Sequence, residues 1–375
     1  MLKPIYTNYD LQLEILTPTH IGMGQEKNYL RGLDFIINKN KDDDGKTLYI
    51  LRADKVMAEV AKSAKDLQTL TTKLSSGKYN DIEKLLISLE VLKNKNMLLR
   101  YEAAYSDTIS EIKRQFSNGL GEYLIPGSSI KGAIRSVIYK QLKKNNPNEK
   151  DENKLFGKID NNLMNLLTVS DVILPKECVI VYRTKVFSAD GRPEKGEGMW
   201  KHERKGGHSN RFKESGFVSF YEGIKPKTKA KARIGIRSQI QNERLKQIPN
   251  QKLVFQKSLE DLFQMIREHT KVYLQREKEY FQKYKNDDIE ETVFNKIDDL
   301  LKINSESKSS CVLRLGANVG FHSITGDWQF NNHISPWLPD KYSIKAKTRK
   351  FAFTKKADNS YDFHLMGFVK LSILS

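Results

Sequence analysis

The chain has 375 residues, 38% of them hydrophobic, which is enough to bury apolar cores in two or three domains. It holds 64 lysines and arginines against 46 aspartates and glutamates, and the resulting net charge of +18 favours a polyanionic partner. Its sequence contains neither a run of ~18 apolar residues that could span a membrane nor an N-terminal signal segment. We therefore expect a cytoplasmic protein without a membrane partner, and nucleic acid as the polyanion.

The N-terminal part predicts a strand, a loop, a strand pair and then a helical insertion. The loop after the first strand, THIGMG, contains Gly22 and Gly24 among polar residues. The period of the apolar residues changes from two to about 3.6 near residue 54, and we expect the helical insertion to extend to residue 118. The elements expected here are strands at 9–16, 33–37 and 48–51 and helical runs between 54 and 93.

Residues 124–139, LIPGSSIKGAIRSVIY, predict a capped amphipathic helix. Ser128 or Ser129 can cap a helix that begins at Ile130. Lys131 and Arg135 lie four residues apart on its polar face. Unpaired backbone N–H groups at a helix start, next to two cations, favour a phosphate, although such helices also occur without a ligand. The apolar face is expected to contain Ile130, Ala133, Ile134, Val137, Ile138 and Leu142.

The segment 195–237 carries nearly half of the net charge, with twelve lysines and arginines and four glutamates. In KPKTKAKARIGIR the cations keep one parity, and alternate residues of a strand share a face. We therefore expect a β-ribbon with one basic side that follows a phosphate backbone. The alternative is a charged hairpin that contacts only solvent. The cations concerned are Lys225, Lys227, Lys229, Lys231, Arg233 and Arg237.

A long helix is expected at 258–284, with an antiparallel partner at 288–303, and a strand at 310–315 then leads into the glycine loop LRLGANVGFHSITG. Glycine permits positive φ and a close approach of the backbone. The spacing matches neither Walker A nor the dinucleotide fingerprint, so we expect no nucleotide cofactor. Arg314 on the incoming strand favours an RNA-facing surface.

Metal binding is not predicted. Cys178 and Cys311 lie far apart in apolar runs without metal-ligand spacing, so we expect buried, reduced thiols. His202 and His208 are six residues apart and lack further ligands, which makes a zinc site improbable.

Three of these stretches together resemble the RAMP superfamily of CRISPR effector proteins. They are the loop TPTHIGMG, the helix start IPGSSIKGAIR and the glycine loop, which is followed by TRKF at 348–351 and by the closing strand MGFVKLS. Their order and spacing are most similar to the fifth subunit of type III-A (Csm) complexes, which caps the 3′ end of the crRNA. Residues 54–118 and 190–310 carry no motif of the family.

The resemblance implies an α+β fold built on a ferredoxin-like, RRM-related core. The expected domains are 1–190 with the helical insertion 54–118, a basic β-ribbon insertion at 191–257, and a helical hairpin with C-terminal strands at 258–375. It also implies that Ser128, Ser129, Lys131, Arg135 and the backbone of Gly316 and Gly320 grip crRNA phosphates. The remaining expected RNA-binding residues are His20, Gly22, Gly24, Arg314, Asn318, Lys225, Lys227, Lys229, Lys231 and Arg233.

The partners implied are crRNA, the other Csm subunits, above all the backbone subunit, and host nucleases that trim crRNA. We expect a non-catalytic role in crRNA maturation and antiviral defence. The alternative is an endoribonuclease: Asp34 lies where the family's backbone subunit carries the aspartate that cuts target RNA, and His20 and His322 are candidates for acid–base cleavage. Asp34 can equally be a strand-end carboxylate that pairs with a neighbour. A further alternative is a basic scaffold that meets only acidic proteins.

Overall fold

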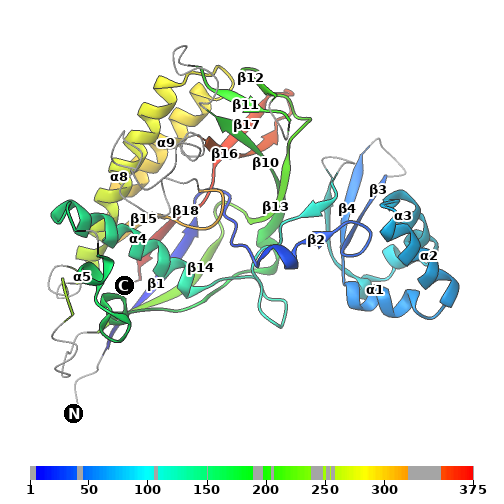
Figure 1. The fold of residues 1–375 in the computed structure, drawn as a ribbon, viewed down its shortest axis with the longest axis horizontal. Coiled ribbons are helices and arrows are strands. Elements are labelled where there is room, and N and C mark those ends of the chain that lie inside the picture. Colours follow the sequence, from blue (N-terminus) through cyan, green and yellow to red (C-terminus); the bar gives the residue numbers. More distant parts are fainter. Residues whose placement is uncertain are drawn as a thin grey trace. The chain divides into compact units, whose positions relative to one another are not determined.

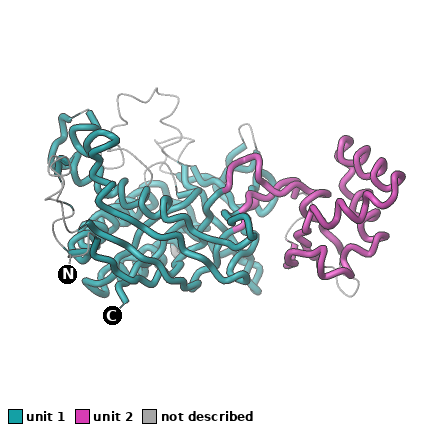
Figure 2. Tube along the Cα trace, turned by 90° about the horizontal axis from the view of Figure 1, so that it is seen from below, with its two compact units in different colours: residues 1–22, 115–219, 223–375 teal, residues 23–114, 220–222 magenta. Residues whose placement is uncertain are grey.

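A computed structural model describes the chain over residues 6–39, 45–104, 109–149, 151–188, 197–203, 207–237, 248–250, 254, 258–319 and 348–374. The chain divides into two compact units (Figure 2). Unit 1 contains residues 1–22, 115–219 and 223–375, and unit 2 contains residues 23–114 and 220–222. Among the helices of the described ranges, none is both long and apolar enough to cross a bilayer.

The first sheet of unit 1 has the strand order β15-β18-β1-β14-β8, and each neighbouring pair is antiparallel (Figure 1). Helix α4 follows β1 in the chain and α8 follows β14, and the two helices contact each other and the sheet. The bounds are β1 Tyr6–Ile15, α4 Gly127–Asn145, β8 Leu167–Val169, β14 Lys229–Arg237, α8 Leu259–Lys283, β15 Ser310–Arg314 and β18 Phe368–Ile373.

Alternation along the strands separates an apolar face from a polar one. Leu11 and Leu13 of β1 are fully buried with Ile234 of β14 in one core, which also contains Ile130 and Ile134 of α4. Gln12, between the two leucines, is paired in register with Lys231 on the opposite face. The predicted apolar face of α4 is therefore confirmed, with Ala133 half-buried at its margin.

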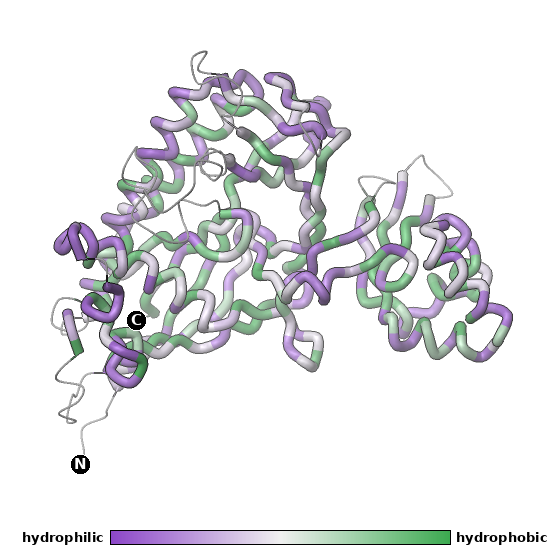
Figure 3. Tube along the Cα trace, in the orientation of Figure 1, coloured by the Kyte–Doolittle hydropathy of each residue, from purple (hydrophilic) through white to green (hydrophobic). Residues whose placement is uncertain are grey.

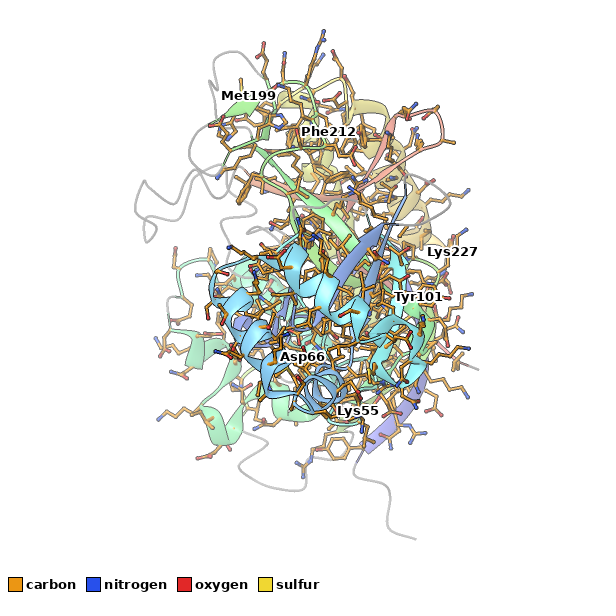
Figure 4. The ribbon with its side chains drawn as sticks, turned by 90° about the vertical axis from the view of Figure 1, so that its right-hand side faces the viewer. Lys55, Asp66, Tyr101, Met199, Phe212 and Lys227 are labelled. Carbon is orange, nitrogen blue, oxygen red and sulfur yellow. The ribbon has the colours of Figure 1, made fainter. Side chains whose placement is uncertain are left out.

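The second sheet of unit 1 surrounds an aromatic core. Its order is β12-β11-β10-β16-β17, with β13 also paired to β10, and α9 and the C-terminal half of α8 pack on it. The ring centroids of Trp200 and Phe363 lie 4.8 Å apart, and those of Phe212 and Phe363 lie 4.9 Å apart. Figure 4 labels Phe212. The bounds are β10 Val179–Ser188, β11 Met199–Lys201, β12 His208–Ser209, β13 Ser219–Ile224, α9 Glu290–Ser305, β16 Thr348–Lys355 and β17 Tyr361–Leu365.

Unit 2 packs three helices on an antiparallel sheet of order β3-β4-β5. Figure 3 shows hydrophobic and hydrophilic residues alternating along these helices, as expected for amphipathic helices on a sheet. Glu83 of α3 is buried. Its Oε1 accepts hydrogen bonds from Arg31 Nε at 2.9 Å and from the backbone N of Ile37 at 3.0 Å. The bounds are β2 Tyr29–Leu30, β3 Phe35–Lys39, β4 Lys46–Leu51, α1 Ala53–Val60, α2 Ala64–Ser75, α3 Tyr79–Ser88, β5 Leu98–Ala103 and β6 Glu111–Ile112.

Short elements complete the fold: β7 Leu124–Ile125 pairs with β9 Val172–Ile173, and α5 Glu152–Phe156 follows α4. The 3-10 turns are η1 Gln25–Lys27, η2 Val91–Lys93, η3 Lys95–Met97, η4 Ile159–Asn161, η5 Leu163–Leu166 and η6 Lys176–Cys178.

The α+β class and the long helical pair are confirmed, and both cysteines are buried free thiols. Three local expectations differ. Residues 98–114 contribute strands β5 and β6 rather than helix, and α4 begins at Gly127 rather than Ile130. The segment expected as an inserted basic ribbon supplies β14, an inner strand between β1 and β8. The expected domain ranges 1–190, 191–257 and 258–375 stay a prediction.

Candidate nucleic-acid interface

The glycine loop and the early loop meet through their backbones. The backbone N of Ala317 donates to the carbonyl oxygen of His20 at 2.8 Å. Gly316, which precedes it, has a φ of 92°, and a Cβ there would lie 2.5 Å from the same oxygen. Gly316 is therefore required for contact with the chain's own early loop, where the sequence suggested close approach to a ligand.

The turn before β18 joins the same place. The backbone N of Leu315 donates to Gly367 O at 2.8 Å, and that of Gly367 donates to Pro18 O at 3.0 Å. Thr17 Oγ1 accepts from the backbone N of Phe368 at 2.9 Å. Three segments that are far apart in sequence are thus tied by main-chain hydrogen bonds.

Gln115 connects these loops to the strand that leads into α4. Its side chain is fully buried, and Oε1 accepts from the backbone N of Ile21 at 2.9 Å while Nε2 donates to Leu124 O at 3.4 Å. Sequence reasoning missed Gln115, because a single glutamine in a polar segment gives no signal of burial. We call residues 17–22, 115–116, 315–319 and 366–368 the loop junction.

The N-terminus of α4 is capped by a carboxylate from another segment, so the expected serine cap is wrong. The backbone N of Gly127 donates to Asp171 Oδ1 at 2.7 Å, and Asp171 lies in the turn between β8 and β9. Pro126 is the N-cap and makes no side-chain bond. Ser128 is exposed and Ser129 half-buried, both within the first turn. One N–H group at the start of α4 is therefore already bonded to an anion of the chain itself.

The two cations of α4 differ in their surroundings. Arg135 forms an ion pair with Glu152 of α5, and its guanidinium lies 4.6 Å from the ring centroid of Phe156. Lys131 is half-buried, its burial lowers its pKa, and the described residues give it no ion pair. Of the two, Lys131 is the better placed to receive an external phosphate.

The cations of 225–237 do not form an uninterrupted basic face. Arg233 Nε pairs with Asp10 Oδ1 at 2.8 Å and Lys229 Nζ lies 3.7 Å from Glu14 Oε2, both acids on the adjacent strand β1. Lys225 and Lys227 lie in the turn before β14, and Lys227 is exposed there with a φ of 68° (Figure 4). Lys231 is also exposed on β14, and its register partner on β1 is the uncharged Gln12.

Arg314 and Asn318 flank the glycine loop. Arg314 is held by the protein: Nε donates to Met366 O at 2.9 Å, and the guanidinium lies 4.7 Å from the ring centroid of Phe368. Asn318 adopts a φ of 64°, and its buried Nδ2 has no hydrogen-bond partner within the described ranges. Nδ2 is thus a buried donor for which the described part of the chain supplies no acceptor.

The catalytic candidates are separately placed. His20 is only 2% exposed in unit 1, and its Nε2 lies beside Gly22. Asp34 belongs to unit 2, where Oδ2 accepts from the backbone N of Leu30 at 2.9 Å and burial raises the pKa of its carboxyl group. That geometry is typical of a carboxylate that closes a turn.

Three sequence candidates remain. Gly24 is exposed in unit 2 with a φ of 104°. Gly320 and His322 lie outside the described residues. No group of three or more His, Cys, Asp or Glu side chains in the described part of the chain could hold a metal ion.

The chain is similar to known proteins in both sequence profile and fold. The profile of the RAMP superfamily matches residues 12–321. A chain of the Csm–crRNA–target RNA ternary complex of a type III-A CRISPR-Cas system superposes with a TM-score of 0.63 at 17% identity, covering 98% of this chain and 100% of that one. T. onnurineus Csm5 superposes with a TM-score of 0.58 at 15% identity, covering 97% and 100%. No curated protein sequence matches the chain.

Proposed function

Because this chain belongs to the RAMP superfamily, we propose that it is the crRNA-binding subunit that caps the crRNA 3′ end in a type III-A CRISPR effector complex. In this role it closes one end of the backbone filament in the cytoplasm. Its partners are the crRNA and the backbone subunit, with host nucleases that trim crRNA as further partners. The similarity of fold to T. onnurineus Csm5 over nearly the full length of both chains supports this choice of subunit.

The topology of the first sheet supports a ferredoxin-like core. Taking β1, β8, β14 and β18 as first to fourth strands, the sheet order is fourth, first, third, second. Helix α4 lies in the chain between the first strand and the second, after the elements of unit 2, and α8 lies between the third and the fourth, before α9, β15, β16 and β17. This order supports a β-α-β-β-α-β core with inserted elements, in which β15 is added at the edge beside β18.

The loop junction is the observation that carries the proposal. It brings the early loop, the glycine loop and the strand before α4 together through backbone bonds and Gln115. The chemistry that we propose it offers RNA is the Nδ2 of Asn318, which has no acceptor among the described residues, and the N-terminal part of α4 adds Ser128 and Lys131. These groups suit phosphate and sugar oxygens, so we propose binding without sequence readout.

The absence of catalysis is part of the proposal. Its support is the burial of His20 and the engagement of the Asp34 carboxylate in a turn. A general base must reach the proton that it removes, and neither group is presented for that role in this conformation.

The experiment is a binding titration of the full chain with labelled crRNA over a series of salt concentrations. Lys131→Ala should weaken binding and flatten the slope of log K against log salt by about 0.7, the value for one lost phosphate contact on single-stranded nucleic acid. Asn318→Ala should weaken binding with the slope unchanged, because it removes a neutral donor.

Lys154→Ala, at an exposed lysine of α5, is the matched control and should leave both quantities unchanged. Wild-type affinity and slope in Lys131→Ala, together with wild-type affinity in Asn318→Ala, would reject the assignment. RNA recovered from the mixture should be uncut with Mg²⁺ or with EDTA; cleavage abolished by His20→Ala or Asp34→Ala would instead identify an endoribonuclease.

A further inference from the structure

Helices α4 and α8 pack on one side of the first sheet, and the other side carries alternate residues of β1 and β14 (Figure 1). Leu11 and Ile234 are fully buried on the side of the helices. Residues of the opposite parity, among them Asn8, Lys231 and Arg233, are exposed. We call the side that carries these three residues the outer face of the first sheet.

The acids of β1 on the outer face are already paired with bases of the neighbouring strand. Asp10 Oδ1 accepts from Arg233 Nε at 2.8 Å, and Glu14 Oε2 lies 3.7 Å from Lys229 Nζ. In each pair the two residues are register partners of β1 and β14. The net charge of these two strands on the outer face therefore comes from the remaining cations.

The remaining cations are Lys231 and Arg237. Lys231 is exposed, and its register partner is the uncharged Gln12. Arg237 is partly exposed, and its guanidinium carbon lies 5.9 Å from the ring centroid of its register partner Tyr6. Neither side chain has an ion pair within the described ranges, so two positive charges on this face are uncompensated there.

Polar and aromatic side chains converge next to Arg237, above Gly235. A Cβ at Gly235 would lie 2.5 Å from Thr168 Oγ1 and 2.7 Å from Asn8 Oδ1. The same position lies 3.6 Å from Cδ1 of Tyr6. Thr168 Oγ1 donates to Gly235 O at 3.3 Å, whereas the exposed amide of Asn8 has no hydrogen bond in the described part of the chain. This amide offers a donor and an acceptor beside an aromatic ring.

We propose that the outer face binds single-stranded RNA that runs along β14. Its phosphates lie at Lys231 and Arg237, which are six residues and therefore about 20 Å apart on one strand. One base lies at Tyr6 and Asn8, because bases stack on aromatic rings and guanidinium planes, and their edges pair with polar side chains. A duplex keeps its bases stacked and an acidic protein has none, so either would use the cations alone.

This contact is separate from the one proposed at α4. Ile130 and Ile134 of α4 pack in the core on the other side of the sheet, so Lys131 is not part of the outer face. The inference requires a single-stranded RNA and does not rest on the capping role. Failure of the Lys131 experiment would leave this inference standing, and failure here would leave the contact at Lys131 standing.

The test is a fluorescence anisotropy titration of the full chain with fluorescein-labelled hexauridylate over a series of salt concentrations. Tyr6→Leu should weaken binding at least about fivefold, as for the loss of one base stack, with an unchanged slope of log K against log salt. Tyr6→Phe should bind like wild type, because stacking requires the ring and not the hydroxyl group. A loss in Tyr6→Phe as large as that in Tyr6→Leu would overturn the proposal.

Lys231→Ala and Arg237→Gln should each flatten the salt slope by about 0.7. Lys271→Ala, at an exposed lysine of α8, is the matched control and should change neither affinity nor slope. The same changes should recur in a Lys131→Ala background, because the two contacts are separate. The proposal is wrong if hexauridylate does not bind, or if it binds equally to wild type, Tyr6→Leu and Lys231→Ala.

Photo-crosslinking locates the RNA without any substitution in the protein. Hexauridylate that carries a 4-thiouridine should crosslink to peptides of β1 or β14, identified by mass spectrometry. Crosslinks confined to α4 and the glycine loop would contradict the inference. With crRNA that carries the same label, crosslinks to β1 or β14 would identify the crRNA as the occupant. Crosslinks there only from an oligonucleotide added to crRNA-loaded protein would identify a second RNA.

Discussion

Two buried cations show how differently one fold can treat a charge. Arg349 of β16 is enclosed, and its Nε and Nη2 each donate to Glu277 of α8 at 2.7 Å in a bidentate pair, with Tyr280 stacked at 4.1 Å. Lys140 is enclosed to a similar degree, and its Nζ has no such acceptor among the described residues. The arginine is therefore paired and links β16 to α8, whereas the lysine, without a described acceptor, is a net cost to folding.

The cost at Lys140 depends on pH. Burial lowers its pKa from the ordinary value of 10.5 to about 7, in surroundings that also contain His269, Tyr273 and Arg314. Between these two pKa values the unfolded chain binds the proton and the folded chain does not, so stability rises with pH across this window. The penalty is complete below pH 7 and disappears towards pH 10.5, and it falls by about 1.4 kcal/mol for each pH unit in between.

Lys140→Met should therefore stabilise the protein, and more at pH 7 than at pH 9.5. Urea unfolding at both pH values measures this, and the gain over wild type should shrink by at least about 1 kcal/mol at the higher pH. Lys144→Met, at an exposed lysine one turn further on, should show no such pH-dependent gain. A constant gain for Lys140→Met would mean that Lys140 is protonated throughout.

At the scale of elements, close backbone contacts decide where loops can meet. Gly316 and Gly367 both have positive φ, and a Cβ at either would press on a carbonyl oxygen of a neighbouring segment. Gly127 is similarly confined, because a Cβ there would overlap Val169 O. The loop junction and the start of α4 therefore require glycine at these three positions, because a side chain there would overlap a neighbouring segment.

Gly316→Ala should destabilise the protein by about 1–3 kcal/mol, because alanine at this φ is strained and its Cβ meets His20 O. Urea unfolding measures the stability, and the crRNA titration should show a parallel loss of affinity as the glycine loop shifts. Gly119→Ala is the matched control, since a Cβ there meets no atom within 4 Å. Equal stability of the two variants would show that the loop contact is not required.

Helices could be predicted well because their signals are local. The helix expected at 258–284 is α8, whose Ser258 backbone N donates to Asp261 Oδ2 at 2.9 Å in a capping box. The start of α4 was misplaced because its cap, Asp171, lies 44 residues further along the chain. A pattern of apolar residues shows a helix face but not a capping residue from another segment.

The sequence pattern predicted where strands lie in the chain, but it did not predict which strands pair with each other. The parity of the cations in β14 correctly placed Lys229 and Arg233 on one face. It could not show that β1 lies alongside and brings Asp10 and Glu14 to the same face, more than 200 residues away in sequence. The sequence motifs likewise indicated the early loop and the glycine loop. The hydrogen bond from Ala317 N to His20 O that joins them, and the hydrogen bonds of the Gln115 side chain, depend on tertiary packing and could not be predicted.

At the scale of the molecule, each compact unit has its own core. The apolar clusters around α4 and around Trp200 consist of unit 1 residues, and the cluster around α1 to α3 consists of unit 2 residues. Because these clusters share no side chain, we expect the two units to lose structure separately when one core is damaged.

Leu86→Ala removes a fully buried side chain of α3, at a cost of about 2–5 kcal/mol. Hydrogen exchange read by mass spectrometry should accelerate in β3, β4 and β5, while β1 and β14 keep their protection. Ile234→Ala, at an equally buried position of β14, should give the reverse pattern. Loss of protection across both units in either variant would show that the chain unfolds as one cooperative body.

The pairing of β1 with β18 also determines when the central sheet can be completed during synthesis of the chain. Leu13 is in register with Leu371, so the first strand of the central sheet cannot find one of its partners until the last strand has been translated. At an elongation rate of about 5–20 residues per second this interval is roughly 20–70 s. Throughout it, β1 is a nascent strand with an apolar face and an unpaired edge, which ribosome-associated chaperones recognise. The loop junction, which needs the turn before β18, can form only after that wait.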